Sequence, residues 1–172
     1  AESEIREVKR LAKRWMLRTD SPKKLWDHCI KLASLIRSHT VHDMYQLKGQ
    51  VPEAVLMGRT PGISHICEFG WYDWVIYRIE GQSYPYTHKK LGRVLGPADN
   101  AGSVMSQWVL AKTGDVMPIQ TLRHLTPAEL NNPTIQERMK EFTAAITKKL
   151  GDSATVPKPD NNEEEDEVDD PD

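Results

Sequence analysis

Apolar residues recur at steps of three and four along the first part of the chain, which is the spacing of one face of an α-helix. In the first segment they are Ile5, Val8, Leu11, Ala12 and Trp15, and the helix is predicted to end near Thr19. Ser21 and Pro22 then predict the N-cap and first turn of a second helix that runs to about His39. Its predicted buried stripe consists of Leu25, Trp26, Cys29, Ile30, Ala33 and Ile36.

The pattern changes towards the middle of the chain. Pro52 predicts the start of a short third helix and Gly58 its end, and Thr60, Pro61 and Gly62 predict a loop. Aromatic and β-branched residues predict a strand over 71–79, and further short apolar segments lie at 89–96, 103–111 and 116–125. The last two are joined by Lys112-Thr113-Gly114-Asp115, a good hairpin turn. Several short strands with tight turns predict a small β-barrel over residues 67–125.

A last helix is predicted within residues 126–151. Asn132 is placed to cap it, Pro133 fits its first turn, and Gly151 ends it. Its apolar stripe consists of Ile135, Met139, Phe142, Ile146 and Leu150. Residues 152–172 include the run EEEDEVDD and cannot bury a core, so a disordered acidic tail is expected.

Composition fits a soluble globular protein. Of 172 residues, 38% are hydrophobic and 28% are charged. No apolar run approaches the about 20 residues of a membrane span, and no secretory leader opens the sequence. The two cysteines, Cys29 and Cys67, are too few for a disulfide scaffold and fit a reducing compartment.

The net charge of -2 conceals a strong asymmetry. Residues 152–172 hold ten acids and one lysine, so residues 1–151 carry +7. Residues 1–48 alone hold eleven Lys and Arg against six Asp and Glu. A basic N-terminal part is typical of a protein with a polyanionic partner.

One face of the first helix carries a carboxylate followed by cations. These residues are Glu2, Arg6, Lys9 and Lys13, with Arg10 and Arg14 beside them. The spacing fits a solvated helix face with a Glu–Arg pair. It also fits a phosphodiester site, in which the carboxylate holds a divalent metal and the cations hold the flanking backbone. A metal cage would need at least two more carboxylates, and Glu4 and Glu7 point to other faces of the helix.

The stretches AESEIREVKR, SPKKLWDHCIKLASLI and VPEAVLMGRTPGISH resemble the end of the integrase core in copia-type LTR retrotransposon polyproteins, in the variant common in diatoms and other protists. The segments FGWYDWVIYR, KKLGRVLGPADNAGSVMSQWVLAKTGDVM and TLRHLTPAEL also look like that family. The resemblance covers most of residues 1–150. It implies an α+β chain, in which residues 1–66 are the terminal helices of a ribonuclease-H-like core and residues 67–125 form a Src-homology-3-like barrel.

The resemblance also implies roles for single residues. Ala1-Glu2 matches the alanine-glutamate pair whose glutamate is the third carboxylate of a DDE set, so Glu2 is the candidate catalytic and metal-binding residue. Arg6 and Lys9 match DNA-binding positions, and Arg10, Lys13 and Arg14 complete the candidate DNA-binding row. The two aspartates would lie upstream. The intact integrase would use Mg²⁺ or Mn²⁺, whereas this fragment is expected to bind neither tightly and to be inactive alone.

Other candidate sites have weaker patterns. His39 with His42, and His65 with Cys67, form two loose pairs rather than the four ligands of a structural zinc site. Cys29 is expected to be a small core residue rather than a nucleophile.

The predicted barrel carries both aromatic and basic side chains. One face of the first strand, which holds Trp71, Tyr72, Trp74 and Tyr77, should be core, and the other could expose an aromatic ring for base stacking or docking. Its cations are expected to form a positive surface that touches DNA backbone. These cations are Arg78, Lys89, Lys90, Arg93 and Arg123.

Two functions from different classes follow. The first is DNA integration, by an intracellular fragment located in the nucleus or in a cytoplasmic virus-like particle, with DNA and the remainder of the polyprotein as partners, homo-oligomerisation left open and no membrane contact. The second is a non-catalytic interaction or nucleic-acid-binding module, derived from a degenerate or domesticated element. The acidic tail would be either a linker or a segment that folds back over the basic helix.

Overall fold

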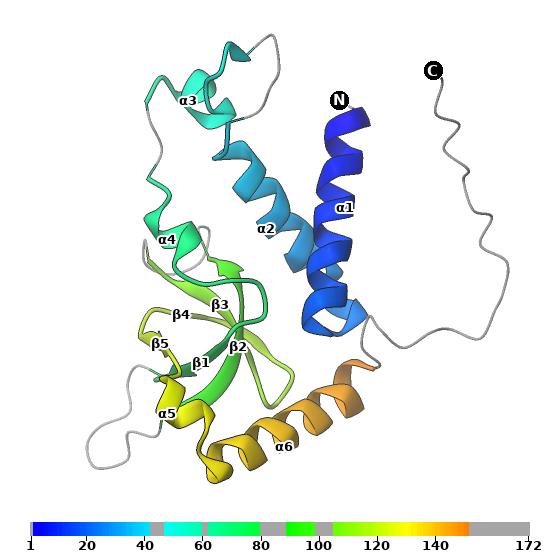
Figure 1. The fold of residues 1–172 in the computed structure, drawn as a ribbon, viewed down its shortest axis with the longest axis vertical. Helices are drawn as coiled ribbons and strands as arrows, with labels where there is room; N and C mark the ends of the chain where they lie inside the picture. The colour runs from blue at the N-terminus through cyan, green and yellow to red at the C-terminus, as the bar shows by residue number, and fades with distance from the viewer. Residues whose placement is uncertain (1, 42–46, 60–61, 80–88, 99–104, 152–172) are drawn as a thin grey trace, which may run out of the picture.

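The computed structural model describes residues 2–41, 47–59, 62–79, 89–98 and 105–151. The predicted acidic tail lies outside these residues. Two long N-terminal helices lie beside a small sheet, and a third long helix runs along the sheet at the C-terminal end (Figure 1). These helices are α1 (Glu2–Thr19), α2 (Trp26–Ser38) and α6 (Pro133–Leu150).

The helix α1 is confirmed, whereas the start of α2 differs from the prediction. A 3₁₀ turn, η1 (Lys23–Leu25), precedes α2, and the Ser21 side chain caps neither element. Ser21 is instead fully buried, and its Oγ accepts a hydrogen bond of 3.2 Å from the indole Nε1 of Trp71. A buried indole N–H needs an acceptor. This contact, between residues 50 positions apart, therefore takes the hydroxyl that would have capped the helix.

Trp26 is also placed wrongly by the predicted stripe. It opens α2 and is 57% exposed, whereas Leu25, one residue earlier, is buried. Trp26 is already part of α2 and lines an open hollow beside α1 together with Ile30, so this end of the stripe is left uncovered. The remaining members of the stripe are buried or half-buried as expected.

Two short helices connect α2 to the sheet. The helix α3 (Pro52–Met57) has the predicted proline in its first turn and ends at Gly58, whose φ of 68° places it in the left-handed region. The helix α4 (Ser64–Cys67) was not predicted. Its four residues give too little periodicity to detect in the sequence.

The sheet is antiparallel and has five strands in the order β4-β3-β2-β1-β5. The strands are β1 (Trp74–Tyr77), β2 (Lys90–Pro97), β3 (Gln107–Ala111), β4 (Val116–Ile119) and β5 (Leu122–His124). The mixed helix and antiparallel-sheet class is therefore confirmed.

Sequence patterns located the strands better than they located the strand ends. β1 is shorter than the predicted strand because Tyr72 adopts a positive φ of 62° in the turn before it. The predicted strand over 116–125 is in fact two strands, separated at Gln120 and Thr121. The hairpin turn between β3 and β4 is confirmed, with the Gly114 N–H donating to the Ala111 carbonyl at 2.9 Å.

The C-terminal helices have clear caps. In α5 (Pro127–Leu130), which was not predicted, Thr126 and Glu129 form a capping box. In α6 the predicted cap is present, since Asn132 Oδ1 accepts a hydrogen bond of 2.9 Å from the Thr134 N–H. Gly151 ends the helix as expected.

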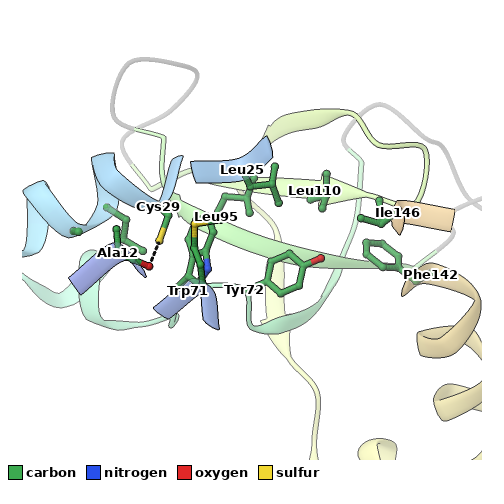
Figure 2. Close-up of a cluster of buried hydrophobic side chains, with 12 residues drawn as sticks. Ala12, Leu25, Cys29, Trp71, Tyr72, Leu95, Leu110, Phe142 and Ile146 are labelled. Carbon is green, nitrogen blue, oxygen red and sulfur yellow. Dashed lines mark hydrogen bonds between the residues drawn. The ribbon is translucent and has the colours of Figure 1, made fainter. Parts of the chain in front are cut away.

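One buried cluster joins the N-terminal helices, the sheet and α6 (Figure 2). Its members include Ala12 from α1, Cys29 from α2, Leu110 from the sheet, and Phe142 and Ile146 from α6. The division into units at 1–66, 67–125 and 126–151 stays a prediction, but the described core draws side chains from all three segments. A second, smaller cluster lies within the sheet around Val75, Val94 and Val109.

Candidate nucleic-acid interface

The cationic face of α1 is open to solvent. All six predicted residues are exposed, namely Glu2, Arg6, Lys9, Arg10, Lys13 and Arg14. The structure places them on one helix, α1, whose buried residues are Ala12 and Met16. Each cation is therefore available to a partner that approaches from solvent.

Few carboxylates compete for this row. Within the described residues, Arg10 is the one cation of the row that has a carboxylate within ion-pair distance, at 3.6 Å from Glu7, and both side chains are well exposed. The Glu2–Arg6 pair allowed by the spacing is not formed. Exposed pairs of this kind contribute about 0–1 kcal/mol, so Arg10 remains able to change partners.

The carboxylates of α1 do not assemble a metal site. Glu4 Oε2 accepts hydrogen bonds from Arg37 Nε at 3.0 Å and Nη2 at 2.7 Å, which fixes it between α1 and α2. Nowhere in the described ranges do three His, Cys, Asp or Glu side chains lie close enough to hold a metal ion. The residues present do not fit Mg²⁺ or Mn²⁺ at Glu2, because such ions need several oxygen ligands.

Two apolar hollows flank the cationic row. One, of about 600 Å³, is lined by Ala12, Met16, Leu17, Trp26 and Ile30, and Lys9, Lys13 and Lys23 also line it. The other, of about 580 Å³, lies towards the start of α1 and includes Ile5, Val8 and Pro52. Trp26 and Ile5 are 57% and 56% exposed. This side of the α1–α2 pair therefore presents an apolar surface beside the cations.

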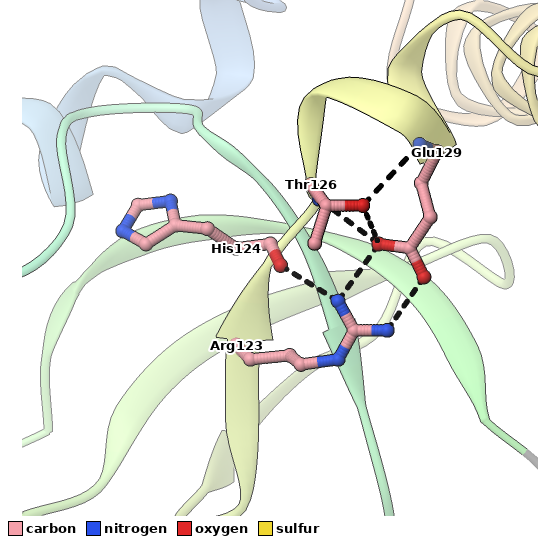
Figure 3. Close-up of polar contacts among 4 residues, drawn as sticks. All are labelled: Arg123, His124, Thr126 and Glu129. Atoms are coloured by element: carbon pink, nitrogen blue, oxygen red, sulfur yellow. Dashed lines mark hydrogen bonds and ion pairs between the residues drawn. The ribbon is translucent and has the colours of Figure 1, made fainter.

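The positive surface expected on the strand region is smaller than predicted. Arg78, Lys89 and Lys90 are exposed, as expected. Arg123 is instead held by Glu129, with Nη2 to Oε1 at 2.6 Å and Nη1 to Oε2 at 2.8 Å (Figure 3). This two-point pairing matches the planar guanidinium to the carboxylate and lowers the pKa of Glu129 to about 2.

Arg93 is only partly exposed and is held by neighbouring aromatic rings. Its guanidinium carbon lies 3.4 Å from the ring centre of Trp74 and 4.4 Å from that of Tyr72. Its Nη1 donates a hydrogen bond of 2.7 Å to the Tyr72 carbonyl. Burial lowers the pKa of Arg93 to about 10, so the side chain is still a cation at neutral pH.

The predicted exposed aromatic ring is not present on β1 or in the turn before it. Trp71, Tyr72 and Tyr77 are buried, and burial raises the pKa of both tyrosines. Trp74 is half-buried, with Arg93 over its ring and Phe142 against its edge, at 5.2 Å between ring centres. Base stacking on these rings is therefore not supported by the geometry.

The histidine and cysteine candidates are separated or engaged. Cys29 is buried as predicted, and its Sγ donates to the Ala12 carbonyl at 3.5 Å. His39 lies with its Nδ1 at 2.9 Å from both Ser38 Oγ and the Leu35 carbonyl. His42 lies outside the described residues. His65 and Cys67 lie on the short helix α4, where they do not join a group of three possible metal ligands within the described part of the chain.

Comparison of the chain with known protein families, with curated proteins and with solved structures finds no match in any of the three. Among the described helices, none is both long enough and apolar enough to cross a membrane.

Proposed function

We propose that this chain is the C-terminal part of a retroelement integrase and that it binds DNA through the phosphate backbone. The observation that supports the proposal is the exposed row of five cations on α1 behind Glu2. Placed cations are sufficient for phosphate contacts, and phosphate contacts need no base-reading side chain. Binding is therefore expected to depend steeply on salt and little on sequence. The protein would act in the nucleus or in a virus-like particle.

The strand order supports the proposal that residues 67–125 form a small barrel similar to the Src-homology-3 fold. β1 to β4 form an antiparallel meander, and β5 returns to pair with β1 at the other edge. A small barrel similar to the Src-homology-3 fold would close such a sheet by bringing these edges together. The apolar hollows on α1 and α2 support the proposal that residues 1–66 are the terminal helices of a ribonuclease-H-like core. The remainder of such a core in the polyprotein would cover these hollows.

DNA binding is tested by neutralising one side of the row. The variant Arg6→Gln/Arg10→Gln/Arg14→Gln should bind a 20-base-pair duplex more weakly than the unchanged chain. Each lost phosphate contact should flatten the slope of log K against log salt by about 0.9, so the three together should flatten it by about 2 to 3. Fluorescence anisotropy at a series of salt concentrations measures the slope.

A matched control removes the same charge elsewhere. Lys24→Gln/Lys48→Gln/Arg59→Gln changes three exposed cations outside α1. If both triple variants lose the same affinity, or if binding is insensitive to salt, the α1 interface is not the DNA site.

The described residues hold no complete carboxylate set, and this leads to a separate expectation. Glu2 alone cannot hold two catalytic metals, so the isolated chain should neither trim nor join DNA ends with Mg²⁺ or Mn²⁺. A gel assay with labelled DNA ends provides the measurement. Metal-dependent cleavage that disappears in Glu2→Gln would refute the incomplete-site proposal.

The second candidate function, a non-catalytic interaction module, is favoured by the hollow at Leu17 and Trp26. Exposed apolar side chains grouped in this way are typical of surfaces that bind other proteins. Leu17→Ser/Trp26→Ser should reduce self-association in sedimentation experiments and leave duplex binding unchanged. If duplex binding falls equally, the hollow and the cationic row are one interface. The coding sequence upstream provides a further test, because two aspartates in an integrase-like frame would favour integration.

A further inference from the structure

A shallow hollow between β1, β2 and α6 gathers cations that the α1 interface does not include. It has a volume of about 820 Å³. Trp74 and Arg93 line it from the sheet, and Lys140 and Lys148 line it from α6, with Thr143 and Thr147 between them. No carboxylate lines this hollow among the described residues, so its lining carries three positive charges.

Arg93 is held rigidly at the wall of the hollow. The rings of Trp74 and Tyr72 lie 3.4 and 4.4 Å from its guanidinium carbon, and Nη1 is hydrogen-bonded to the Tyr72 carbonyl. Stacking of this kind offsets part of the cost of removing a guanidinium from water. It also fixes the plane of the group, so little freedom remains to be lost when a ligand binds.

The hydrogen-bonding needs of Arg93 are not met. Its Nε is buried and has no acceptor in the described part of the chain. A buried donor on a cation that has no acceptor destabilises the folded state. Asp73 acts on Arg93 through its charge, but no described carboxylate forms an ion pair with it, and the Asp73 Oδ2 accepts instead from the Gly70 N–H at 2.8 Å. Within the described residues the Arg93 charge therefore has no ion-pair partner, and an anion in the hollow would supply the missing counter-charge.

We propose that this hollow binds a phosphate group, with Arg93 as the fixed planar donor and Lys140 and Lys148 as the mobile point charges. Arginine pairs with phosphate oxygens through parallel N–H donors, and lysine ammonium groups neutralise the remaining charge. The phosphate comes either from a nucleic-acid backbone or from free phosphate. The site is separate from the row on α1, so it does not depend on the function proposed above.

Nuclear magnetic resonance of the whole chain tests the site. The Trp74 indole N–H and the Arg93 Nε–H are followed while inorganic phosphate replaces chloride at constant ionic strength, and then while a 12-base-pair duplex is added. Both resonances should move with phosphate and saturate. Lys140→Gln/Lys148→Gln changes two exposed side chains and should weaken the phosphate response about tenfold. The matched control Lys24→Gln/Lys48→Gln should leave it unchanged.

The two phosphate sources give different results. Movement with both probes identifies a nucleic-acid backbone as the ligand, and movement with inorganic phosphate alone identifies free phosphate. Resonances that follow ionic strength only, or that respond equally in the double variant and in its control, overturn the proposal. Loss of duplex binding in the α1 variant with an intact phosphate response would support the proposal, because it shows that the two sites are separate. Arg93→Lys, which keeps the charge and removes Nε–H, should also weaken the response.

Discussion

At the scale of single residues, Arg93 and Arg123 show how the surroundings of a side chain decide what its charge can do. Both lie on strands of the sheet. Arg123 meets a carboxylate and helps hold β5 to α5, whereas Arg93 meets two aromatic rings and keeps an unpaired N–H. The first cation is therefore occupied by the fold, and the second remains able to bind an anion.

The Glu129 carboxylate makes the connection between β5 and α5 sensitive to acid. Hydrogen bonds from Arg123 and Thr126 lower its pKa to about 2 from an ordinary 4.5. A carboxylate with a lowered pKa in the folded state stabilises the fold fully above its unfolded pKa and loses that contribution as pH falls through the folded pKa. The free energy of unfolding should therefore fall between about pH 5 and pH 2 through this group.

Glu129→Gln provides the comparison, because it keeps the shape of the side chain and removes its charge. The stability difference between the unchanged chain and this variant, measured by urea unfolding, should be present at pH 6 and vanish near pH 2. A difference that does not change with pH would show that the carboxylate charge contributes nothing there.

The two cysteines should differ sharply in reactivity. Cys29 is fully buried, and burial raises the pKa of its thiol to about 12, whereas Cys67 is exposed. Because the thiolate is the reactive form, a soluble disulfide reagent at pH 8 should label only the Cys67 thiol rapidly in the folded chain. In denaturant it should label both thiols rapidly. Mass spectrometry of peptides identifies the labelled residue, and Cys67→Ser should abolish the rapid phase. Rapid labelling of Cys29 would contradict the packing of α1 against α2.

At the scale of elements, the sequence correctly predicted those helix ends that are fixed by residues close to them in the chain. Pro52 with Gly58, and Asn132 with Gly151, bound helices whose caps are formed by near neighbours. Ser21 failed as a signal because its hydroxyl accepts from Trp71, which only the folded chain brings near. Patterns that span a few residues cannot predict contacts between residues that are far apart in the sequence.

At the candidate site, too, features set by local spacing could be predicted, and features set by distant contacts could not. The exposed row on α1 could be predicted because helical spacing alone places Arg6, Lys9 and Lys13 on one side. The burial of Arg93 under Trp74 could not, because the contact depends on the turn before β1 and on the pairing of β1 with β2. The hollow shared by Arg93 and α6 also depends on how the helix packs against the sheet.

Gly92 is required by the close packing of β2 rather than by its backbone conformation. A Cβ atom there would lie 2.6 Å from Val109 Cγ1, 2.9 Å from Tyr77 Cε1 and 3.0 Å from the Leu110 carbonyl oxygen. Gly92→Ala should therefore lower the free energy of unfolding by about 1–3 kcal/mol, the usual cost of overpacking a core. Chemical denaturation monitored by circular dichroism measures the loss.

The matched control is Gly62→Ala. A Cβ atom at Gly62 would have no neighbour within 4 Å. This change should alter the stability by less than about 0.5 kcal/mol. Equal losses in the two variants would mean that strand packing is not the cause of the Gly92 effect.

At the scale of the whole molecule, the buried cluster links parts of the chain that its sequence patterns separate. Ala12 and Cys29 belong to the N-terminal helices, and Phe142 and Ile146 belong to the last helix, yet all four lie in one cluster with Leu110 of the sheet. If these contacts act together, the helical pair and the sheet should unfold in a single transition.

Phe142→Ala tests this coupling between distant segments. Phe142 is 1% exposed, so its truncation should cost about 3–5 kcal/mol. Because one cluster is shared, the loss should reach α2, and the slow labelling of the Cys29 thiol should speed up by the factor by which the global unfolding equilibrium constant rises. Quantitative labelling in dilute urea gives the measurement, and Glu137→Ala on the exposed side of α6 is the control. Unchanged labelling of Cys29 in the destabilised variant would mean that residues 1–66 form an independent unit, as the sequence resemblance implies.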